Sequence, residues 1–196
     1  MPWQMRERQA ARFVWLGQLR RLRECDQVAA VCYRVRGGAI EFLLVQTGGG
    51  RWTFPKGSTE PGLTHAQAAA LEAFEEAGVH GRMEEASFTR YLYRKRSGTR
   101  GVTTQLAVSA HLCEVLRLEA PEEANRNPTW FSPKEAKRSL RQDHGAGCGA
   151  EMARVVDRAV RRVRRSRNEP RHHIHVTDGS GRAPVIEIDY LRRSGG

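Results

Sequence analysis

The chain has 196 residues and a formal net charge of +11, which comes from 33 Lys and Arg against 22 Asp and Glu. Its length suits one domain with short extensions. Four scattered cysteines exclude a disulfide framework, no run of 18 apolar residues could span a bilayer, and no signal peptide opens the chain. We therefore expect a cytoplasmic protein with no membrane partner. The basic charge favours an anionic partner, such as a nucleotide, an inositol phosphate or a nucleic acid, although an arginine-biased genome would give the same composition.

The first segment, residues 1–24, mixes arginines with apolar residues and predicts a basic, loosely amphipathic helix. Because it contains glutamates and no serine, a transit peptide is the less favoured interpretation. We interpret it as a basic N-terminal helical extension.

Strands and helices are predicted to alternate through residues 25–167. Runs rich in β-branched and apolar residues predict strands over 28–35, 40–47, 87–95 and 102–116. Helical patterns and end signals predict helices over 65–77, 133–140 and 151–165. Gly37-Gly38 suits a hairpin turn between the first two strands, and Ser132 suits an N-cap before Pro133. The alternation predicts a single α/β domain in which helices cover a mixed sheet.

The last segment, residues 168–196, differs in texture from the domain. Two short strand-like runs, 173–177 and 184–191, flank a glycine-rich turn, so both an appended hairpin and a disordered tail stay open. His172, His173 and His175 offer transition-metal ligands, but their place on an extension disfavours that role.

The helix over 65–77 presents an acidic face. A capping box of Thr64 with Gln67 begins it, and a glycine follows its last residue. At 100° per residue, Glu72, Glu75 and Glu76 share an arc of about 100°, opposite an alanine-rich face that suits packing on a sheet.

Carboxylates at these spacings repel one another, each pair costing roughly 0.2 to 0.5 kcal/mol. No Lys or Arg lies between Gly57 and Gly81 to compensate. A hard divalent cation such as Mg²⁺, which takes oxygen ligands, is the compensating group that we expect. On helical spacing alone, a solvated acidic face is the competing interpretation.

The helix and the residues before it resemble a known sequence motif. The stretch 57–79 is similar to the Nudix box, G-x5-E-x7-R-E-U-x-E-E-x-G-U with U apolar, and matches it at seven of nine fixed positions. The stretches 27–34, 52–57 and 130–136 also resemble landmarks of Nudix hydrolases. The segment 52–57 and the basic strand after the box look most like the diadenosine polyphosphate and diphosphoinositol polyphosphate hydrolase branch.

The resemblance implies an α/β/α sandwich and hydrolysis of a diphosphate linkage with Mg²⁺ or Mn²⁺. It implies that Glu72 and Glu76 are the catalytic residues and the principal metal ligands. Glu75 assists them, and the carbonyl of Gly57 completes the metal site.

Two box positions depart from the family pattern. Leu63 stands where the family has its first glutamate, and Leu71 where it has the arginine that braces the next glutamate. Glu60 is a candidate replacement for the lost acid. We interpret the stretch as a variant catalytic box, and a non-catalytic binding module is the alternative.

Cationic side chains suit a phosphate-rich small-molecule substrate. Lys56, beside the loop glycine, is expected to meet a phosphate. Further candidates lie on the strand and turn after the box, although a solvated hairpin is the alternative there: Arg90, Arg94, Lys95 and Arg96. The general base is either a box carboxylate or an acid of the later loop, Glu122 or Glu123.

A nucleic-acid function is the main rival. Arginines recur along the predicted helix over 151–165, and such a run could follow a phosphate backbone, as removal of pyrophosphate from RNA 5′ ends would require. A solvated helix face is the alternative. The sequence leaves the oligomeric state open.

Overall fold

The computed structural model describes residues 27–97, 102–168 and 185–188. The predicted N-terminal extension and the three histidines near position 173 lie outside these residues. The predictions made for them therefore stay predictions.

A mixed sheet forms the centre of the described fold. Its main path runs β3-β2-β1-β7-β5-β9, while β4 pairs with β1, β6 with β7 and β8 with β2. The β1 and β7 pair is parallel and every other pair is antiparallel. The strands are β1 (Gln27–Arg36), β2 (Ala39–Gln46), β3 (Trp52–Thr53), β4 (Lys56–Ser58), β5 (Val79–Glu84), β6 (Thr89–Ser97), β7 (Val102–Leu118), β8 (Thr129–Phe131) and β9 (Val185–Ile188).

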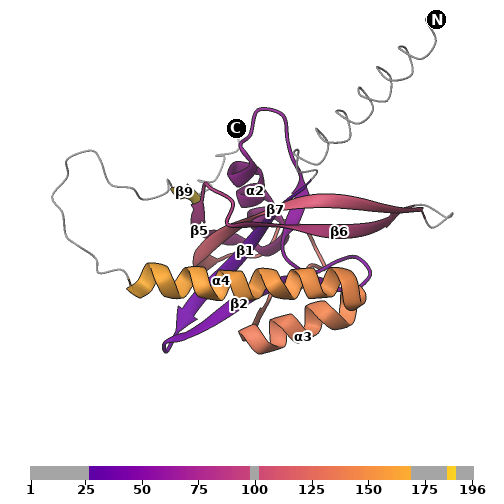
Figure 1. Cartoon of the computed structure of the whole chain (residues 1–196). Helices are drawn as coiled ribbons and strands as arrows, with labels where there is room; N and C mark the ends of the chain where they lie inside the picture. Colours follow the sequence, from indigo (N-terminus) through magenta and orange to yellow (C-terminus); the bar gives the residue numbers. More distant parts are fainter. Residues whose placement is uncertain (1–26, 98–101, 169–184, 189–196) are drawn as a thin grey trace, which may run out of the picture.

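Helices cover both faces of this sheet (Figure 1). Helix α2 (His65–Ala77) packs on one face, and α3 (Pro133–His144) and α4 (Ala150–Asn168) pack on the other, joined by the π-helical turn η1 (Gly145–Gly149). Strand β1 supplies both cores in alternation, because Val28 belongs to the α2 side and Ala29 to the α4 side. The predicted α/β/α sandwich with a mixed sheet is confirmed.

The predicted elements agree with the structure where their end signals were strong. Helix α2 has the predicted bounds, and Ser132 caps α3 with Pro133 in its first turn. The two later helices run further than predicted, to His144 and Asn168. Strand β5 was missed because Gly81 and a register shift beside it interrupt the alternation of side chains.

The C-terminal segment contributes an edge to the sheet. Strand β9 pairs antiparallel with β5, a partner that neither prediction for 168–196 included. The other run of the expected hairpin lies outside the described residues. Cys32, Cys113 and Cys148 are buried free thiols. None of the helices in the described part is long and apolar enough to cross a membrane.

Candidate active site

Helix α2 is fixed at both ends. The Gln67 amide donates to the Thr64 hydroxyl at 3.2 Å, and the Thr64 amide donates to the Gln67 side chain at 2.9 Å, which completes the predicted capping box. Gly78 ends the helix in the left-handed region, with φ of 62°, and a Cβ there would overlap the carbonyl of Glu119. The C-terminal end of the helix therefore lies close against the residue that follows β7.

The packed face of α2 consists largely of alanines, which let the helix lie close to the sheet. The buried alanines are Ala66, Ala68, Ala69, Ala70, Ala73 and Ala77. On the other side of the helix Glu72 and Glu75 are half-buried, whereas Glu76 is only 3% exposed. Burial of a carboxylate to this degree requires partners for its oxygens.

Gly57 touches Glu72 across the site. Strand β4 pairs with the start of β1, with Gly57 opposite Val28. A Cβ built on Gly57 would overlap the Glu72 carboxylate group. A side chain at this position would therefore force the end of the Glu72 side chain to move.

Glu76 has a partner on each oxygen. Its Oε2 accepts a hydrogen bond from the Lys56 amide at 3.2 Å, and its Oε1 lies 2.8 Å from Nη2 of Arg126. The arginine comes from the loop between β7 and β8. No sequence pattern had indicated a role for Arg126.

This loop is docked on the C-terminal end of α2. The Glu119 amide donates to the Gly78 carbonyl at 2.8 Å, and the Glu123 amide donates to the Glu75 carbonyl at 2.9 Å. The Glu123 carboxylate also accepts from Arg126 Nη2 at 2.6 Å. The loop thereby brings a fourth acid beside the three of the helix.

The surroundings raise the pKa of the helix carboxylates. Burial, and then the charges of Glu76, Glu75 and Glu123, raise the pKa of Glu72 to about 7, against a smaller lowering by Lys56. The pKa of Glu75 is also raised, first by burial and then by neighbouring acids, and one of those acids is Glu60. Such a concentration of partly uncompensated negative charge suits a cation.

Burial also raises the pKa of Glu76, but the charges of Arg126 and Lys56 oppose this effect. Among the three helix acids, Glu76 thus has the most direct compensation by cationic neighbours.

A model of the NUDIX domain matches residues 26–147. The chain belongs to the Nudix family. The matched residues include strand β4, helix α2 and the loop that carries Arg126.

Two curated relatives share parts of this sequence. Nudix hydrolase 12, mitochondrial, from Arabidopsis thaliana is 32% identical over 113 residues, which cover 53% of each protein. The asymmetrical bis(5′-nucleosyl)-tetraphosphatase from Sus scrofa is 50% identical over 48 residues, which cover 24% of this chain and 33% of that protein. The chain therefore spans about half or less of the length of these two relatives.

Among solved structures, the C. elegans Ap4A hydrolase in a binary complex is similar, with a TM-score of 0.51 and 22% identity. The likeness covers 72% of this chain and 98% of that chain. It supports the Nudix fold found here.

Nudix hydrolases generally use divalent metal ions, and the donors of this Nudix chain are of the right type. Glu72, Glu75 and Glu76 offer the oxygen ligands that hard divalent cations prefer, and Gly57 leaves the space that Glu72 needs. In the described part of the chain, however, no three such side chains converge closely enough to hold an ion. Glu76 is directed instead to Arg126 and to the Lys56 amide.

The predicted phosphate-binding residues fall into two groups. Lys56 is half-buried beside the acids, and its Nζ lies 4.9 Å from the centroid of the Tyr93 ring. Arg90 and Arg94 are exposed and alternate along β6 with buried Tyr93, so they lie on the opposite face of the strand. Neither arginine forms an ion pair with the helix acids in the described structure.

Lys95 and Arg96 complete that predicted set. Both belong to β6, but their side chains lie outside the described residues. Their role stays a prediction.

A second set of contacts beside Lys56 was not expected. His144 Nε2 donates to the Trp52 carbonyl at 2.8 Å, and the Trp52 amide donates to Asp143 at 2.6 Å. The His144 ring also meets Tyr93 edge to face, at 5.7 Å between centroids. These contacts come from the last turn of α3, which lies beyond the predicted end of that helix. A prediction that continued the helix to His144 could have revealed them.

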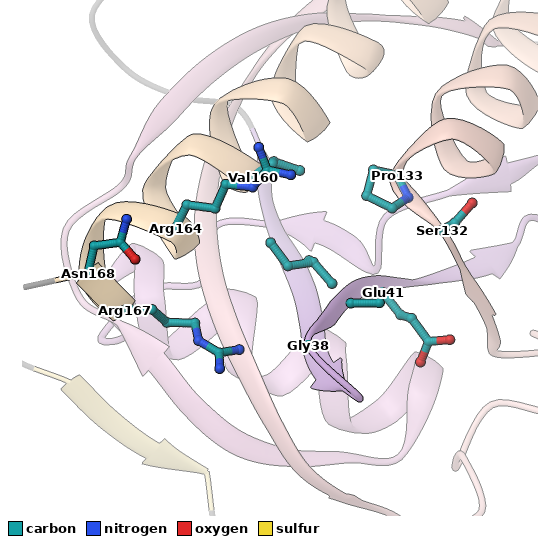
Figure 2. A pocket seen from close by; sticks show the side chains of 10 residues that line it. Gly38, Glu41, Ser132, Pro133, Val160, Arg164, Arg167 and Asn168 are labelled. Atoms are coloured by element: carbon teal, nitrogen blue, oxygen red, sulfur yellow. The ribbon is translucent and has the colours of Figure 1, made fainter.

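A cavity of about 400 Å³ lies elsewhere on this Nudix chain, between α4 and the β1–β2 turn (Figure 2). Ile40 and Val160 line it, and Arg164 and Arg167 project beside it. Val28, the partner of Gly57, lies near the start of β1, and the β1–β2 turn follows the end of that strand. At the rise of a strand, the turn is roughly 25 Å from Val28. The cavity is therefore separate from the acids of α2.

Proposed function

We propose that this Nudix-family chain hydrolyses a phosphoanhydride bond in a polyanionic small molecule, with Mg²⁺ or Mn²⁺ as cofactor. Dinucleoside polyphosphates and diphosphoinositol polyphosphates are the substrate classes. The observation that carries the proposal is the meeting of box residues across the site. Gly57 makes room for the Glu72 carboxylate, and Glu76 lies one helical turn further on with Lys56 against it.

Glu72, Glu75 and Glu76, with the carbonyl of Gly57, would hold the cation. When bound, it would neutralise phosphate charge and acidify the attacking water. Burial, and then the charges of neighbouring acids, raise the pKa of Glu72 to about 7, and a cation would offset those charges. Glu72 and Glu76 are the proposed catalytic residues.

The attacking water must lose a proton as it adds to phosphorus in line with the leaving oxygen. A box carboxylate and a loop acid both stay open as the base. Between the loop acids, Glu123 has the better support, because its charge raises the pKa of Glu72 and its backbone is bonded to α2.

Lys56 is the cation that we propose for the reacting phosphates, since it is the lysine beside Glu72 and Glu76. A substrate with more phosphates could extend toward β6, where Arg90, Arg94, Lys95 and Arg96 follow one another. The names of two similar proteins, a bis(5′-nucleosyl)-tetraphosphatase and an Ap4A hydrolase, support dinucleoside polyphosphates.

Removal of pyrophosphate from RNA 5′ ends is the second candidate. It is favoured by exposed arginines near the C-terminal end of α4 that form no ion pair in the described structure: Arg161, Arg164, Arg165 and Arg167. Binding that weakens steeply with salt would support it. Turnover of free dinucleotides at near-physiological salt would support the small-molecule enzyme instead.

The test is a phosphate-release screen with Mg²⁺ over dinucleoside polyphosphates, diphosphoinositols, nucleotide sugars and 5′-triphosphate RNA. Glu76→Gln is the matched variant, because it keeps the shape of the side chain and removes its charge. We expect the wild type to hydrolyse at least one of the first two classes and the variant to leave it intact. If the wild type hydrolyses nothing that Glu76→Gln leaves intact, the chain is a non-catalytic binding module.

A further inference from the structure

Arg126 joins two acids of the site through one guanidinium group. Its Nη2 lies 2.8 Å from Oε1 of Glu76 and 2.6 Å from Oε2 of Glu123, and its Nε donates to the same Glu123 oxygen at 2.8 Å. The Arg126 side chain is 22% exposed and that of Glu76 only 4%. This ion pair is therefore screened from water far more than a surface pair.

The backbone holds Arg126 in this place. Asn125 and Asn127, its two neighbours, both have left-handed backbone, with φ of 67° and 47°. The Gln46 amide donates to the Arg126 carbonyl at 2.6 Å, and the Asn127 side chain donates to the Gln46 side chain at 3.3 Å. Left-handed backbone on either side of Arg126 is uncommon for non-glycine residues, although asparagine adopts it more readily than most, and such conformations cluster at functional sites.

Arg126 also supplies a charge that helix α2 lacks. The box position where the family has an arginine is Leu71, and no Lys or Arg lies between Gly57 and Gly81. Besides Lys56, a loop far along the chain therefore brings positive charge to the helix acids. It reaches Glu76, which follows Leu71 on the same helix, and not Glu72.

The arginine and a metal ion would compete for Glu76. Oε1 of Glu76 is paired with Arg126, and Oε2 accepts from the Lys56 amide. A guanidinium group beside a ligand carboxylate repels a divalent cation and occupies one of the ligand's oxygens. The described side chains form no ready three-acid cluster, as expected if Glu76 is held by the arginine.

We propose that Arg126 is a positioning residue that serves as the counter-ion of Glu76 in the metal-free protein, and that a divalent cation displaces it from Glu76. Arg126 thus stabilises the empty site and opposes the first step of metal binding. The inference rests on the proposed metal-dependent function, because it assigns Glu76 to the metal.

The test measures Mn²⁺ binding to the full chain after removal of metals by EDTA, from the electron paramagnetic resonance signal of free Mn²⁺, without substrate. Arg126→Gln is compared with Arg138→Gln, an exposed arginine of α3 that changes the net charge equally. We expect Arg126→Gln to bind Mn²⁺ at least about fivefold more tightly than the control, the lower end of typical coupling between two binding equilibria. Its thermal unfolding temperature without metal should be lower than that of the control.

A loss of packing alone would lower stability and metal affinity together, so opposite changes distinguish competition from a structural role. Arg126→Lys keeps the charge and should bind Mn²⁺ within about twofold of the wild type, well short of that fivefold change. If Arg126→Gln binds Mn²⁺ equally or more weakly than the control, the Arg126 proposal is overturned. If the wild type and all variants fail to bind Mn²⁺, the proposed metal-dependent function itself fails.

A measurement on the wild type covers the case in which Arg126→Gln does not fold without metal. The ¹⁵N resonance of the Arg126 Nε, assigned by its absence from the Arg126→Lys spectrum, is followed as Mg²⁺ is added. Displacement from Glu76 predicts a shift that saturates with metal binding. A resonance that stays unchanged while Mg²⁺ binds contradicts the proposal.

Discussion

The carboxylate of Glu72 fills the space in which a side chain at position 57 would begin. Gly57 lies on β4 and Glu72 on α2, and a Cβ on the glycine would overlap the carboxylate. The glycine of the Nudix box therefore lets the Glu72 carboxylate keep its observed place in this chain, and a larger residue would displace that carboxylate.

Gly57→Ala should displace the Glu72 carboxylate and lower kcat by roughly a hundredfold, the scale expected for a misplacement of about 1 Å in a catalytic group. Gly48→Ala is the control, because its Cβ meets nothing within 4 Å. Steady-state kinetics on a substrate found in the screen measures both. Equal activity of the two variants would show that the Gly57 contact does not position Glu72.

The stability of the metal-free chain should depend on pH. Because the pKa of Glu72 in the folded chain is about 7, above its ordinary value of 4.5, the folded state binds more protons than the unfolded state between these values. The free energy of unfolding of the metal-free chain should therefore fall as pH rises from 5 to 8, by on the order of 1 kcal/mol after solvent screening.

Urea unfolding in EDTA at both pH values measures this change, and Glu72→Gln should reduce it. Saturating Mg²⁺ should reduce it as well, since the cation favours the ionised carboxylates. Stability that rises over this range in the wild type would contradict the raised pKa.

Gly78→Ala should destabilise the chain and disturb the docked loop. The left-handed backbone costs an alanine about 1–2 kcal/mol. The overlap of its Cβ with the Glu119 carbonyl should add on the order of 1–3 kcal/mol. Gly38→Ala isolates the second effect, because Gly38 also has positive φ but open space around it. Equal losses of unfolding free energy for Gly78→Ala and Gly38→Ala in chemical denaturation would mean that the loop moves away from the new Cβ at no measurable cost.

Lys56→Gln should raise KM for a polyphosphate substrate by about tenfold or more, as for loss of a hydrogen bond to a charged group. Arg90→Gln and Arg94→Gln should have smaller effects, because both arginines are exposed and form no ion pair with the helix acids in the described structure. Comparison of kcat and KM for the three variants separates the two groups. A larger rise in KM for Arg90→Gln or Arg94→Gln than for Lys56→Gln would place the phosphate site on β6.

The sequence predicted the parts of the site that depend on residues close together in the chain. The bounds of α2 follow from Thr64, Gln67 and Gly78, and the shared face of the three acids follows from helical spacing. The contact of Gly57 with Glu72 agrees with the box spacing, although its steric nature required the structure.

Long-range contacts could not be predicted in this way. Arg126 reaches Glu76 because the loop before β8 folds back on α2, and no pattern around Arg126 in the sequence indicates that fold. His144 was missed for a local reason, since α3 continues past Leu140. The cytoplasmic location, inferred in part from the sparse cysteines, stays a prediction.

The most direct test of the central claim is the rate of diadenosine tetraphosphate hydrolysis with Mg²⁺ by the wild type, Glu76→Gln and Glu85→Gln. Glu85 is an exposed acid outside the site, so its variant controls for the change in charge. We predict Mg²⁺-dependent hydrolysis by the wild type and Glu85→Gln, with a rate at least about a hundredfold lower for Glu76→Gln, as for removal of one electrostatic catalytic group. Equal rates for the two variants would contradict the assignment of the α2 acids.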